Sequence, residues 1–335
     1  MSEVINTGLI NVRPRTIRFY ACGGTAINQL RAYRDNHPGE PRLHGDEKYS
    51  YIDTSFANLD GALMSETFTL KEADGSGSDR KKNAARIVGV LPEIMLAHQP
   101  ADFNVVIFSL SGGTGSVAGP IILKELLAKG HKAVGVTSAA FTSGKKSSNA
   151  IDTLTGLELA VASVGRPVVL SYTPNDPNKT DSDNNIKPLF VLQTLAKLAS
   201  GKNGHLDSSD VANLFDFHTV TNYKPSLALL DVYAGEEQLK SDVTNAIGIA
   251  GLLKDRTSVM PAINAAYDTV GYLPEDNREF ANSFYFVVSI EKLNGVVKDM
   301  SERKAQAELK ERVTNTVSTL ATAGVVVDEA TGLVL

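Results

Sequence analysis

A glycine-rich segment, "SLSGGTGSVAGP" at residues 109–120, directly overlaps the end of the apolar run "FNVVIFSL". Glycines allow backbone amides to approach a ligand closely, and the positive end of a following helix favours an anion. The hydroxyl groups of Thr114 and Ser116 add hydrogen-bond donors. The segment therefore suits phosphate binding, although a packing turn that touches no ligand would have the same composition.

Two common phosphate-binding motifs do not fit this sequence. The Walker pattern requires a glycine five residues before its "GK" pair, and in "AAFTSGKKS" that position holds Ala139. The dinucleotide fingerprint G-x-G-x-x-G should follow the first strand, where the chain reads "ACGGTAINQL". The sequence thus excludes both motifs in their strict form.

Further polar segments lie at or near the ends of expected strands, so they would meet at one edge of a parallel sheet. They contain Gly23, Gly24 and Thr25; Asp53; Gly75, Ser76 and Gly77 with Arg80 and Lys81; and Asn175. Amides and cations suit terminal phosphates, a carboxylate suits a ribose or a magnesium-bound water, and a side-chain amide suits a purine edge. Together these segments predict a nucleotide with a polyphosphate.

The elements that must position these loops follow an α/β pattern. Short apolar runs alternate with amphipathic or Ala/Leu-rich runs, which predicts a parallel sheet covered on both faces. We expect strands at residues 16–22, 49–55, 103–110, 132–139 and 166–173, and helices at 117–130 and 149–165. Residues 223–234 and 282–295 are expected strands of a second sheet, and 297–324 predicts a long charged helix.

The fold class predicted is α/β, with a parallel-sheet nucleotide-binding domain joined by a central helix to a smaller α+β domain. A long C-terminal helix and a tail complete the chain. The expected boundaries are 1–180 for the nucleotide-binding domain, 181–206 for the central helix, 207–292 for the second domain and 293–335 for the last helix and tail. This division agrees with the length of 335 residues, which is enough for two ordinary cores.

Composition narrows the partners and the compartment. Lys plus Arg number 33 against 38 Asp plus Glu, a formal charge of −5, and there is no basic block, so we expect no direct nucleic acid binding. A single cysteine cannot form an intrachain disulfide, which fits a reducing compartment. The sequence has neither a signal-peptide pattern nor eighteen consecutive apolar residues. We therefore expect a cytoplasmic protein that does not bind membranes.

The motifs together resemble those of a known family. "SGGTGS" is similar to the tubulin signature, GGGTGSG or GGGTGTG, and its order relative to "CGGTAIN", "YIDTS", "GSG", "TPND" and "HLDSSD" is that of the superfamily of tubulin and bacterial cell-division tubulin. Within it, "FSLSGGTGSVAGP", "NAIDTL" and "GHLDSSDVAN" resemble the phage-encoded tubulins. The resemblance covers almost the whole chain. Ser111 and Val117 replace the first and last signature glycines.

The resemblance implies a guanine nucleotide, GTP or GDP, with Mg²⁺. Residues implied at the phosphates are Gly23, Gly24, Thr25, Gly75, Ser76, Gly77, Gly112, Gly113, Thr114, Gly115 and Ser116, with Ser111 at the first signature position. Asn28 and Asn175 match guanine-reading positions, and either Asn184 or Asn185 is the second candidate on the central helix. Asn149 is either a ribose-side contact or a helix cap before "AIDTL".

Asp207 and Asp210 in "GHLDSSDVAN" are the candidate catalytic residues. They lie three residues apart, so both carboxylates can share one face of a loop running into a helix. The same spacing also fits a purely structural role, with Asp207 as the N-cap of a helix and Asp210 as an acid in its first turn. The resemblance matches them to the loop that enters the next subunit's nucleotide site, where they would orient the water that attacks the γ-phosphorus. His205 stands where cell-division homologues have asparagine.

The function predicted is a self-assembling GTPase that forms head-to-tail filaments. The resemblance implies that a C-terminal tail, here carrying Asp328 and Glu329, grips the adjacent subunit. It also implies that the filaments position phage DNA in the cytoplasm of a bacterial host. Two alternatives remain open at this point: a nicotinamide-dependent oxidoreductase on a doubly wound sheet, and a filament scaffold that binds GTP without turnover.

Overall fold

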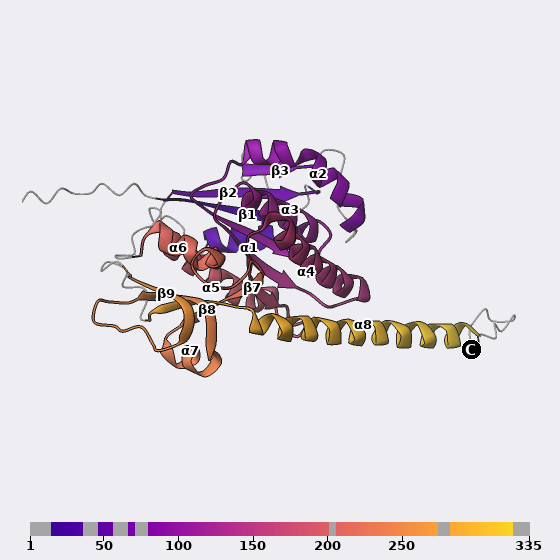
Figure 1. Cartoon of the computed structure of the whole chain (residues 1–335). Helices are drawn as coiled ribbons and strands as arrows, with labels where there is room; N and C mark the ends of the chain where they lie inside the picture. The colour runs from indigo at the N-terminus through magenta and orange to yellow at the C-terminus, as the bar shows by residue number, and fades with distance from the viewer. Residues whose placement is uncertain are drawn as a thin grey trace, which may run out of the picture.

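The computed structural model describes residues 15–35, 46–55, 66–70, 80–200, 206–273 and 282–323. Within these ranges, ten strands form one sheet in the order β3-β2-β1-β4-β5-β6-β7-β10-β8-β9 (Figure 1). The strands are β1 (Thr16–Cys22), β2 (Asp46–Asp53), β3 (Thr67–Thr69), β4 (Phe103–Ser109), β5 (Ala133–Ala139), β6 (Val168–Pro174), β7 (Leu227–Ala234), β8 (Asn245–Leu253), β9 (Asn264–Tyr272) and β10 (Phe284–Ser289).

Helices lie between most of these strands. They are α1 (Gly24–Asp35), α2 (Arg80–Ala97), α3 (Gly115–Ala128), α4 (Gly144–Val164), α5 (Asp181–Ala199), α6 (Ser208–Phe215), α7 (Glu236–Asp242), α8 (Glu291–Ala323) and the 3-10 turn Phe217–Thr219. None of the helices in the described ranges combines the length and the apolar character needed to cross a membrane.

The parallel half of the sheet is buried between two layers of helices, as the sequence predicts. Every residue of β4 and of β5 is buried, because side chains on both faces of these strands meet helices. On one face, Ile27 of α1 and Leu195 of α5 pack against the sheet. On the other, Leu126 of α3 and Leu157 of α4 do the same. The fold class predicted from the sequence is therefore confirmed.

The prediction of a second sheet is wrong. β7 pairs in parallel with β6, through Val168 with Leu227, so the later strands extend the first sheet. β10 then pairs antiparallel with both β7 and β8, while β8 and β9 were not predicted. The reason is that β6 would otherwise be an edge strand, and β7 supplies its missing hydrogen-bonding partner. Residues 291–295 were also expected as strand and form the start of α8.

Helix α5 lies in the chain between the parallel strands β1 to β6 and the later strands. α5 begins at a capping box in which Thr180 accepts from the Asp183 amide and Asp183 accepts from the Thr180 amide. It ends at Ala199, earlier than the expected 206, and its C-terminal half is buried. The domain boundaries drawn from the sequence stay a proposal, because the sheet runs through them without a break.

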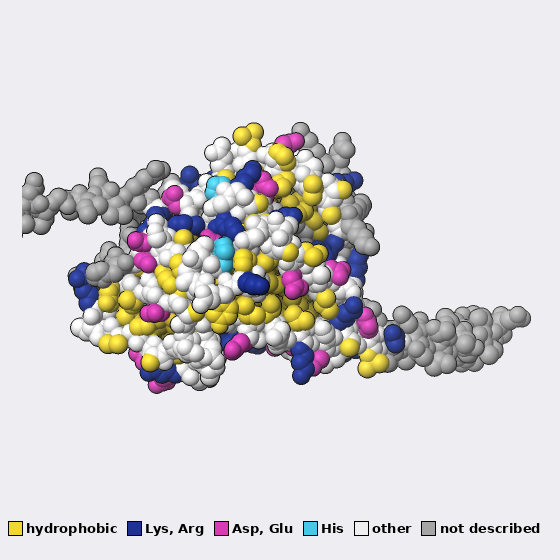
Figure 2. Space-filling model, viewed as in Figure 1, with side chains coloured by type: hydrophobic (Ala, Val, Ile, Leu, Met, Phe, Trp, Pro, Cys, Tyr) yellow, Lys and Arg dark blue, Asp and Glu magenta, His cyan; other side chains and the backbone are white. Residues whose placement is uncertain are grey.

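α8 starts beside β7 and α4, with Met300 fully buried against them, and then extends away from the body of the molecule (Figure 1). Ion pairs one turn apart support its exposed face, for example Arg303 with Asp299 at 2.7 Å. On the described surface seen in Figure 2, basic and acidic side chains are interspersed. Asp328 and Glu329 of the tail lie outside the described residues.

Candidate functional site

The ends of β1, β2 and β4 enclose a cavity of about 140 Å³ at the carboxyl edge of the parallel strands. Gly23 has a φ of +82°, and a Cβ there would lie 2.8 Å from the backbone nitrogen of Gly115. Only glycine therefore allows the two loops to approach so closely. The cavity is lined by Cys22, Gly23, Gly24, Thr25, Asp53, Thr54, Ser55, Ser109, Gly112, Gly113, Thr114 and Gly115. The structure thus brings the predicted loops after β1, β2 and β4 together.

The N-terminus of α3 faces this cavity. Gly115, which lines the cavity, is the first residue of the helix, and Thr114 is its N-cap. The Thr114 side chain makes no capping hydrogen bond, since its Oγ1 lies 2.7 Å from Oγ1 of Thr54 instead. The first amides of α3 therefore have no side-chain cap, and together with the helix dipole they suit an anion such as phosphate.

Asp53 places a carboxylate in the same cavity. It is only 2% exposed, and its Oδ1 accepts a 2.7 Å hydrogen bond from the Thr54 amide. No group of three or more His, Cys, Asp or Glu side chains in the described part of the chain is arranged to hold a metal. Proteins often hold Mg²⁺ by one or two carboxylates with substrate phosphates and water. Asp53, with the hydroxyls of Thr54 and Thr114, fits a magnesium ion bound in that way.

Ser111, at the first signature position, connects two loops. Its Oγ accepts a 2.9 Å hydrogen bond from the Ala140 amide and lies 3.1 Å from Oγ of Ser109. Its side chain is buried and does not line the cavity. Val117, at the last signature position, is 5% exposed and packs in the hydrophobic core. Both departures from the family signature therefore serve packing around the loop rather than filling the space for a ligand.

Asn149 lies inside α4 rather than at its start. α4 begins at Gly144, and Ser143 caps it by accepting from the Lys146 amide. The helix-cap interpretation of Asn149 is therefore wrong, because the residues just before it already form helix. Its Nδ2 donates to the Ser111 carbonyl at 3.3 Å, so Asn149 supports the signature loop. A contact to ribose stays a prediction.

Arg80 and Ser116 lie together on the α4 side of the loop. One Nη of Arg80 donates to the Ser116 carbonyl at 3.3 Å, and the other lies 3.9 Å from Oδ2 of Asp152. Ser116 is fully buried, and its hydroxyl has no partner among the described residues. Arg80 thus borders a groove of about 590 Å³ between α2, α3 and α4, not the small cavity. Gly75, Ser76, Gly77 and the side chain of Lys81 lie outside the described residues.

The structure separates the roles of Asn184 and Asn185. Asn184 accepts from the Asp176 amide at 2.8 Å and donates to the Asp176 carbonyl at 3.0 Å, so its side chain closes the loop before α5. Asn185 instead accepts a 3.1 Å hydrogen bond from Nε2 of Gln29 on α1. Asn185 therefore lies beside the helix that carries Asn28.

Asn175 follows β6 directly, and its backbone amide donates to the Ala139 carbonyl at 2.8 Å. Its Oδ1 is buried and has no partner among the described residues. A buried acceptor without a partner is costly, so such an atom often marks a ligand contact. The N–H groups of a guanine edge would satisfy it. Asn28 is exposed on α1.

The acid pair forms the N-terminal cap of α6. Asp207 Oδ1 accepts from the amides of Ser209 and Asp210 at 2.6 and 3.0 Å, and Asp210 Oδ2 accepts from the Asp207 amide at 2.9 Å. Hydrogen bonds from the Asp210 and Ser209 amides lower the pKa of Asp207. The Tyr267 hydroxyl donates to Asp210 Oδ1 at 3.3 Å. The helix-capping geometry considered from the sequence is therefore present, and it fixes the two carboxylates relative to each other.

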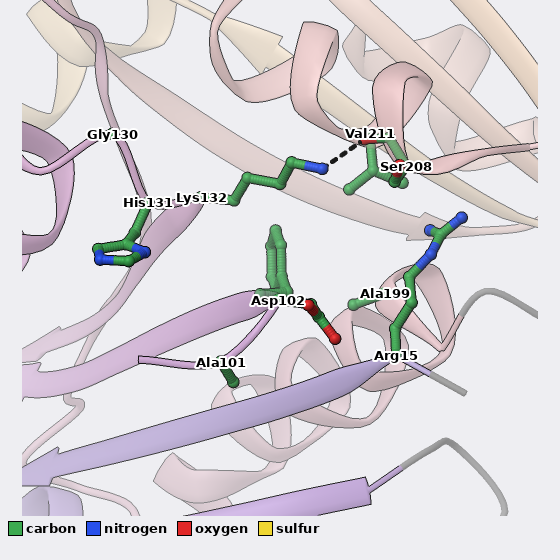
Figure 3. Close-up of a pocket in the computed structure, with 10 residues that line it drawn as sticks. Arg15, Ala101, Asp102, Gly130, His131, Lys132, Ala199, Ser208 and Val211 are labelled. Carbon is green, nitrogen blue, oxygen red and sulfur yellow. Dashed lines mark hydrogen bonds between the residues drawn. The ribbon is translucent and has the colours of Figure 1, made fainter. Parts of the chain in front are cut away.

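α6 begins at the edge of the sheet opposite to the small cavity. Lys132, just before β5, donates from Nζ to the Ser208 carbonyl at 2.8 Å, and Figure 3 shows Lys132 and Arg15 extending toward the start of α6. A second cavity of about 440 Å³ lies between them. The seven residues of β5 span about 23 Å. Asp207 and Asp210 therefore do not reach the glycine loops of their own subunit.

Sequence reasoning missed several contacts at the two edges. The hydroxyl pair of Thr54 and Thr114 joins residues 60 positions apart, and Lys132 meets Ser208 across 76 positions. Thr54 had a local signal, as a polar residue directly after a strand. Nothing near Lys132 in the sequence indicates its partner. His205 lies outside the described residues.

No protein-family model matches the chain. Its sequence is 26% identical over 294 residues to a phage tubulin-like protein of Pseudomonas phage PhiPA3, covering 87% of this chain and 90% of the relative. It is 27% identical over 317 residues to a phage tubulin-like protein of Pseudomonas phage phiKZ, covering 88% and 92%. These likenesses extend over both halves of the molecule.

Solved structures give the same result for the fold. A protofilament of TubZ from bacteriophage PhiKZ superposes with a TM-score of 0.80 at 25% identity, over 88% of this chain and 92% of the other. The phage tubulin PhuZ with GDP gives 0.79 at 24% identity, over 95% and 99%. The chain is thus similar in sequence and in fold to phage tubulins of the tubulin superfamily, as its motifs indicate.

The Ser111 hydroxyl makes a testable contribution to stability. Ser111→Ala removes the acceptor of the Ala140 amide and should lower the free energy of unfolding by about 1–2 kcal/mol. Ser138→Ala is the matched control, because the Ser138 hydroxyl is equally buried and has no partner among the described residues. We expect the control to be neutral or stabilising. Urea unfolding of the ligand-free proteins measures both, and equal effects would contradict the assigned role.

Proposed function

We propose that the chain is a GTPase that assembles head to tail into tubulin-like filaments, in which each subunit's nucleotide site is completed by the next. One observation carries this proposal. The glycine loops and the acid pair lie at opposite edges of one sheet. In a head-to-tail filament the two edges of neighbouring subunits face each other, and such a contact propagates without closing.

The small cavity supports the binding of the nucleotide phosphates. Its lining of glycine backbone and hydroxyl groups, with the start of α3, offers donors without bulk. Asp53 and Thr114 would lie near Mg²⁺. The ion, when bound, would neutralise charge on the phosphate oxygens. Gly75, Ser76 and Gly77 keep their implied role at the γ-phosphate as a proposal from the family resemblance.

The asparagines support guanine as the base. We assign the second contact to Asn185, because the side-chain amide of Asn184 is used by the loop before α5. Asn175 offers a buried acceptor, and Asn28 lies on the helix that Asn185 contacts through Gln29. One of the similar structures is that of a phage tubulin with GDP. The substrate proposed for this chain is therefore GTP.

Hydrolysis is assigned to Asp207 and Asp210 acting on the nucleotide of the adjacent subunit. An ionised carboxylate is a weak base, so its contribution is to orient the attacking water rather than to remove a proton completely. The capping box holds the two carboxylates in a fixed relation, which suits that task. The same geometry also favours the alternative of a scaffold without turnover, since a cap needs no chemistry. Mutation of Asp210 separates the two.

Self-association is supported by the relatives, since similar structures include a phage tubulin protofilament and a phage tubulin filament. The groove between α2, α3 and α4 supports a contact with the tail of an adjacent subunit. Val117 and Ile121 make it apolar, and Arg80, Lys124 and Lys145 border it. The tail "VVVDEATGLVL" is apolar with two acids, so its chemistry matches the groove.

The proposed filaments would act in the cytoplasm of an infected bacterium and position phage DNA there. This step follows from the resemblance to phage tubulins alone. Microscopy of infected cells would test it, since phage DNA that keeps its position without this protein contradicts the role.

Nucleotide binding is tested by Gly113→Val. A branched side chain in the lining of the cavity should block the approach of phosphate oxygens to the loop, and GTP affinity should fall at least about tenfold. Gly89→Val, on an exposed face of α2 with open space around it, controls for the substitution itself. Fluorescent GTP titration measures both. If folded Gly113→Val binds GTP with the parental affinity, the loop does not bind phosphate. Separately, a dinucleotide retained by the purified protein would favour the oxidoreductase.

The shared site is tested by Asp210→Ala. Its monomers should bind GTP normally and polymerise, because the carboxylate serves a different subunit's nucleotide. Hydrolysis per polymerised subunit should fall by on the order of a hundredfold, and the filaments should persist. Asp210→Asn is the matched variant, since its amide oxygen still accepts from the Asp207 amide without the charge.

A purely structural cap would be restored by asparagine, whereas a catalytic carboxylate would not. Mixing Asp210→Ala with Gly113→Val subunits should recover activity, because one keeps the nucleotide pocket and the other keeps the acid pair. Phosphate release from pelleted filaments is the measurement. Parental hydrolysis by Asp210→Ala would leave the two acids as a helix cap.

The tail contact is tested by truncation after Gly324. The truncated protein should bind GTP as the parent does, because the small cavity is lined by residues between Cys22 and Gly115. Its critical concentration for assembly should rise severalfold. Asp328→Asn with Glu329→Gln isolates the electrostatic part, which weakens with salt. Light scattering over a concentration series measures these values, and unchanged assembly of the truncated chain refutes the contact.

A further inference from the structure

Lys132 makes a specific contact with the helix that carries the acid pair. Its Nζ donates a 2.8 Å hydrogen bond to the carbonyl of Ser208, the first residue of α6. A cation at the N-terminus of a helix is normally unfavourable, because it meets the positive end of the dipole. Here Asp207 and Asp210 place two carboxylates at that end. The carboxylates of Asp102, Asp207 and Asp216 offset this unfavourable position of the Lys132 charge.

A second cation faces the same acids. Arg15 lies across the 440 Å³ cavity from Lys132 (Figure 3). Burial lowers the pKa of Arg15, while Asp207, Asp102 and Asp210 oppose that shift, in this order. Asp102 is itself held by the amide and hydroxyl of Thr16. The amino edge of the sheet thus carries two cations, Arg15 and Lys132, that lie among the carboxylates of the acid pair and of Asp102.

The capping box does not fix α6 in the molecule. It sets Asp207 and Asp210 relative to each other, whereas their place on the subunit surface depends on contacts from α6 to its surroundings. From β9, the Tyr267 hydroxyl contacts Asp210. From the side of the parallel sheet, Lys132 donates to the Ser208 carbonyl in the first turn of α6, and Arg166, just before β6, pairs with Asp216 at the C-cap of this helix. Since β5 is buried along its whole length, Lys132 holds α6 from a rigid base.

We propose that Lys132 is a positioning residue for hydrolysis. By holding the Ser208 carbonyl, it fixes the first turn of α6 against the amino edge of the sheet and sets where Asp207 and Asp210 meet the adjacent subunit's nucleotide. Lys132 itself touches no reacting atom. This inference rests on the proposed function, because it assumes that the acid pair acts on that nucleotide.

The test compares Lys132→Met and Lys132→Arg with the parent and with Lys129→Met. Lys129 is a matched control, because it is a lysine close to the same edge whose partner is Glu125. GTP hydrolysis per polymerised subunit is measured at saturating GTP, with GTP affinity and critical concentration in parallel. A displaced catalytic group loses rate rather than substrate binding, and we expect about a tenfold lower rate in Lys132→Met.

GTP affinity and critical concentration should stay within about twofold, because Lys132 does not line the small cavity and contributes one partly buried hydrogen bond. Lys132→Arg should retain most of the rate, because its guanidinium can also donate to the carbonyl, and Lys129→Met should resemble the parent. If Lys132→Met does not fold, Lys132→Ala, which also removes the donor, replaces it. If Lys132→Met hydrolyses GTP at the parental rate while Asp210→Ala is slow, the inference about Lys132 is overturned and the proposed function stands.

Mixed filaments distinguish positioning from an effect through β5 on the variant's own nucleotide site. In pelleted copolymers of Gly113→Val and Asp210→Ala, Lys132→Met should lower the recovered activity only when it is added to the Gly113→Val subunit, which supplies the acids. Equal loss from either subunit would mean a general structural role and overturn the inference. If Asp210→Ala hydrolyses GTP like the parent, the proposed function fails first, whatever Lys132 does.

Discussion

The close contact between the β1–α1 turn and the β4–α3 loop is the constraint on which the site depends. A Cβ on Gly115 would lie 2.6 Å from the Cys22 carbonyl, and one on Gly23 would lie 2.8 Å from the Gly115 amide nitrogen. Because neither side chain exists, β1 and β4 end against each other and α3 begins at their junction. Two further lining residues come from β2, which pairs in parallel with β1: Asp53 ends this strand and Thr54 follows it.

The parallel strands could be predicted closely from the sequence, and the reason is their burial. β1 has the predicted bounds, and β4, β5 and β6 begin and end within two residues of the prediction, because both faces demand apolar side chains. β9 alternates between exposed and half-buried residues and was missed. The pairing of β6 with β7 was also missed, because residues 168–170 meet 227–229 only in the folded chain.

The candidate site likewise contains some residues that the sequence predicts and others that only the folded structure identifies. Glycine loops are visible in the sequence, since a run of small residues after a strand is a local pattern. Asn184 and Asn185 are neighbours of one type, and only tertiary contacts, with Asp176 for the first and Gln29 for the second, separate them. The helix-cap interpretation of Asn149 failed for a related reason: Ser143, six residues earlier, already caps α4. Polar residues that serve another element leave no periodic signal.

β5 connects the two edges on which the proposed mechanism depends. At its amino end, Lys132 holds the first turn of α6 through the Ser208 carbonyl. Just past its carboxyl end, the Ala140 amide donates to Ser111 in the signature loop. A buried strand is one of the stiffest elements of a fold, because it cannot shift without breaking hydrogen bonds on both sides and packing on both faces. The distance between the acid pair and the phosphate loops of one subunit is thus fixed by β5, and in a filament this length sets how each pocket meets its neighbour's acids.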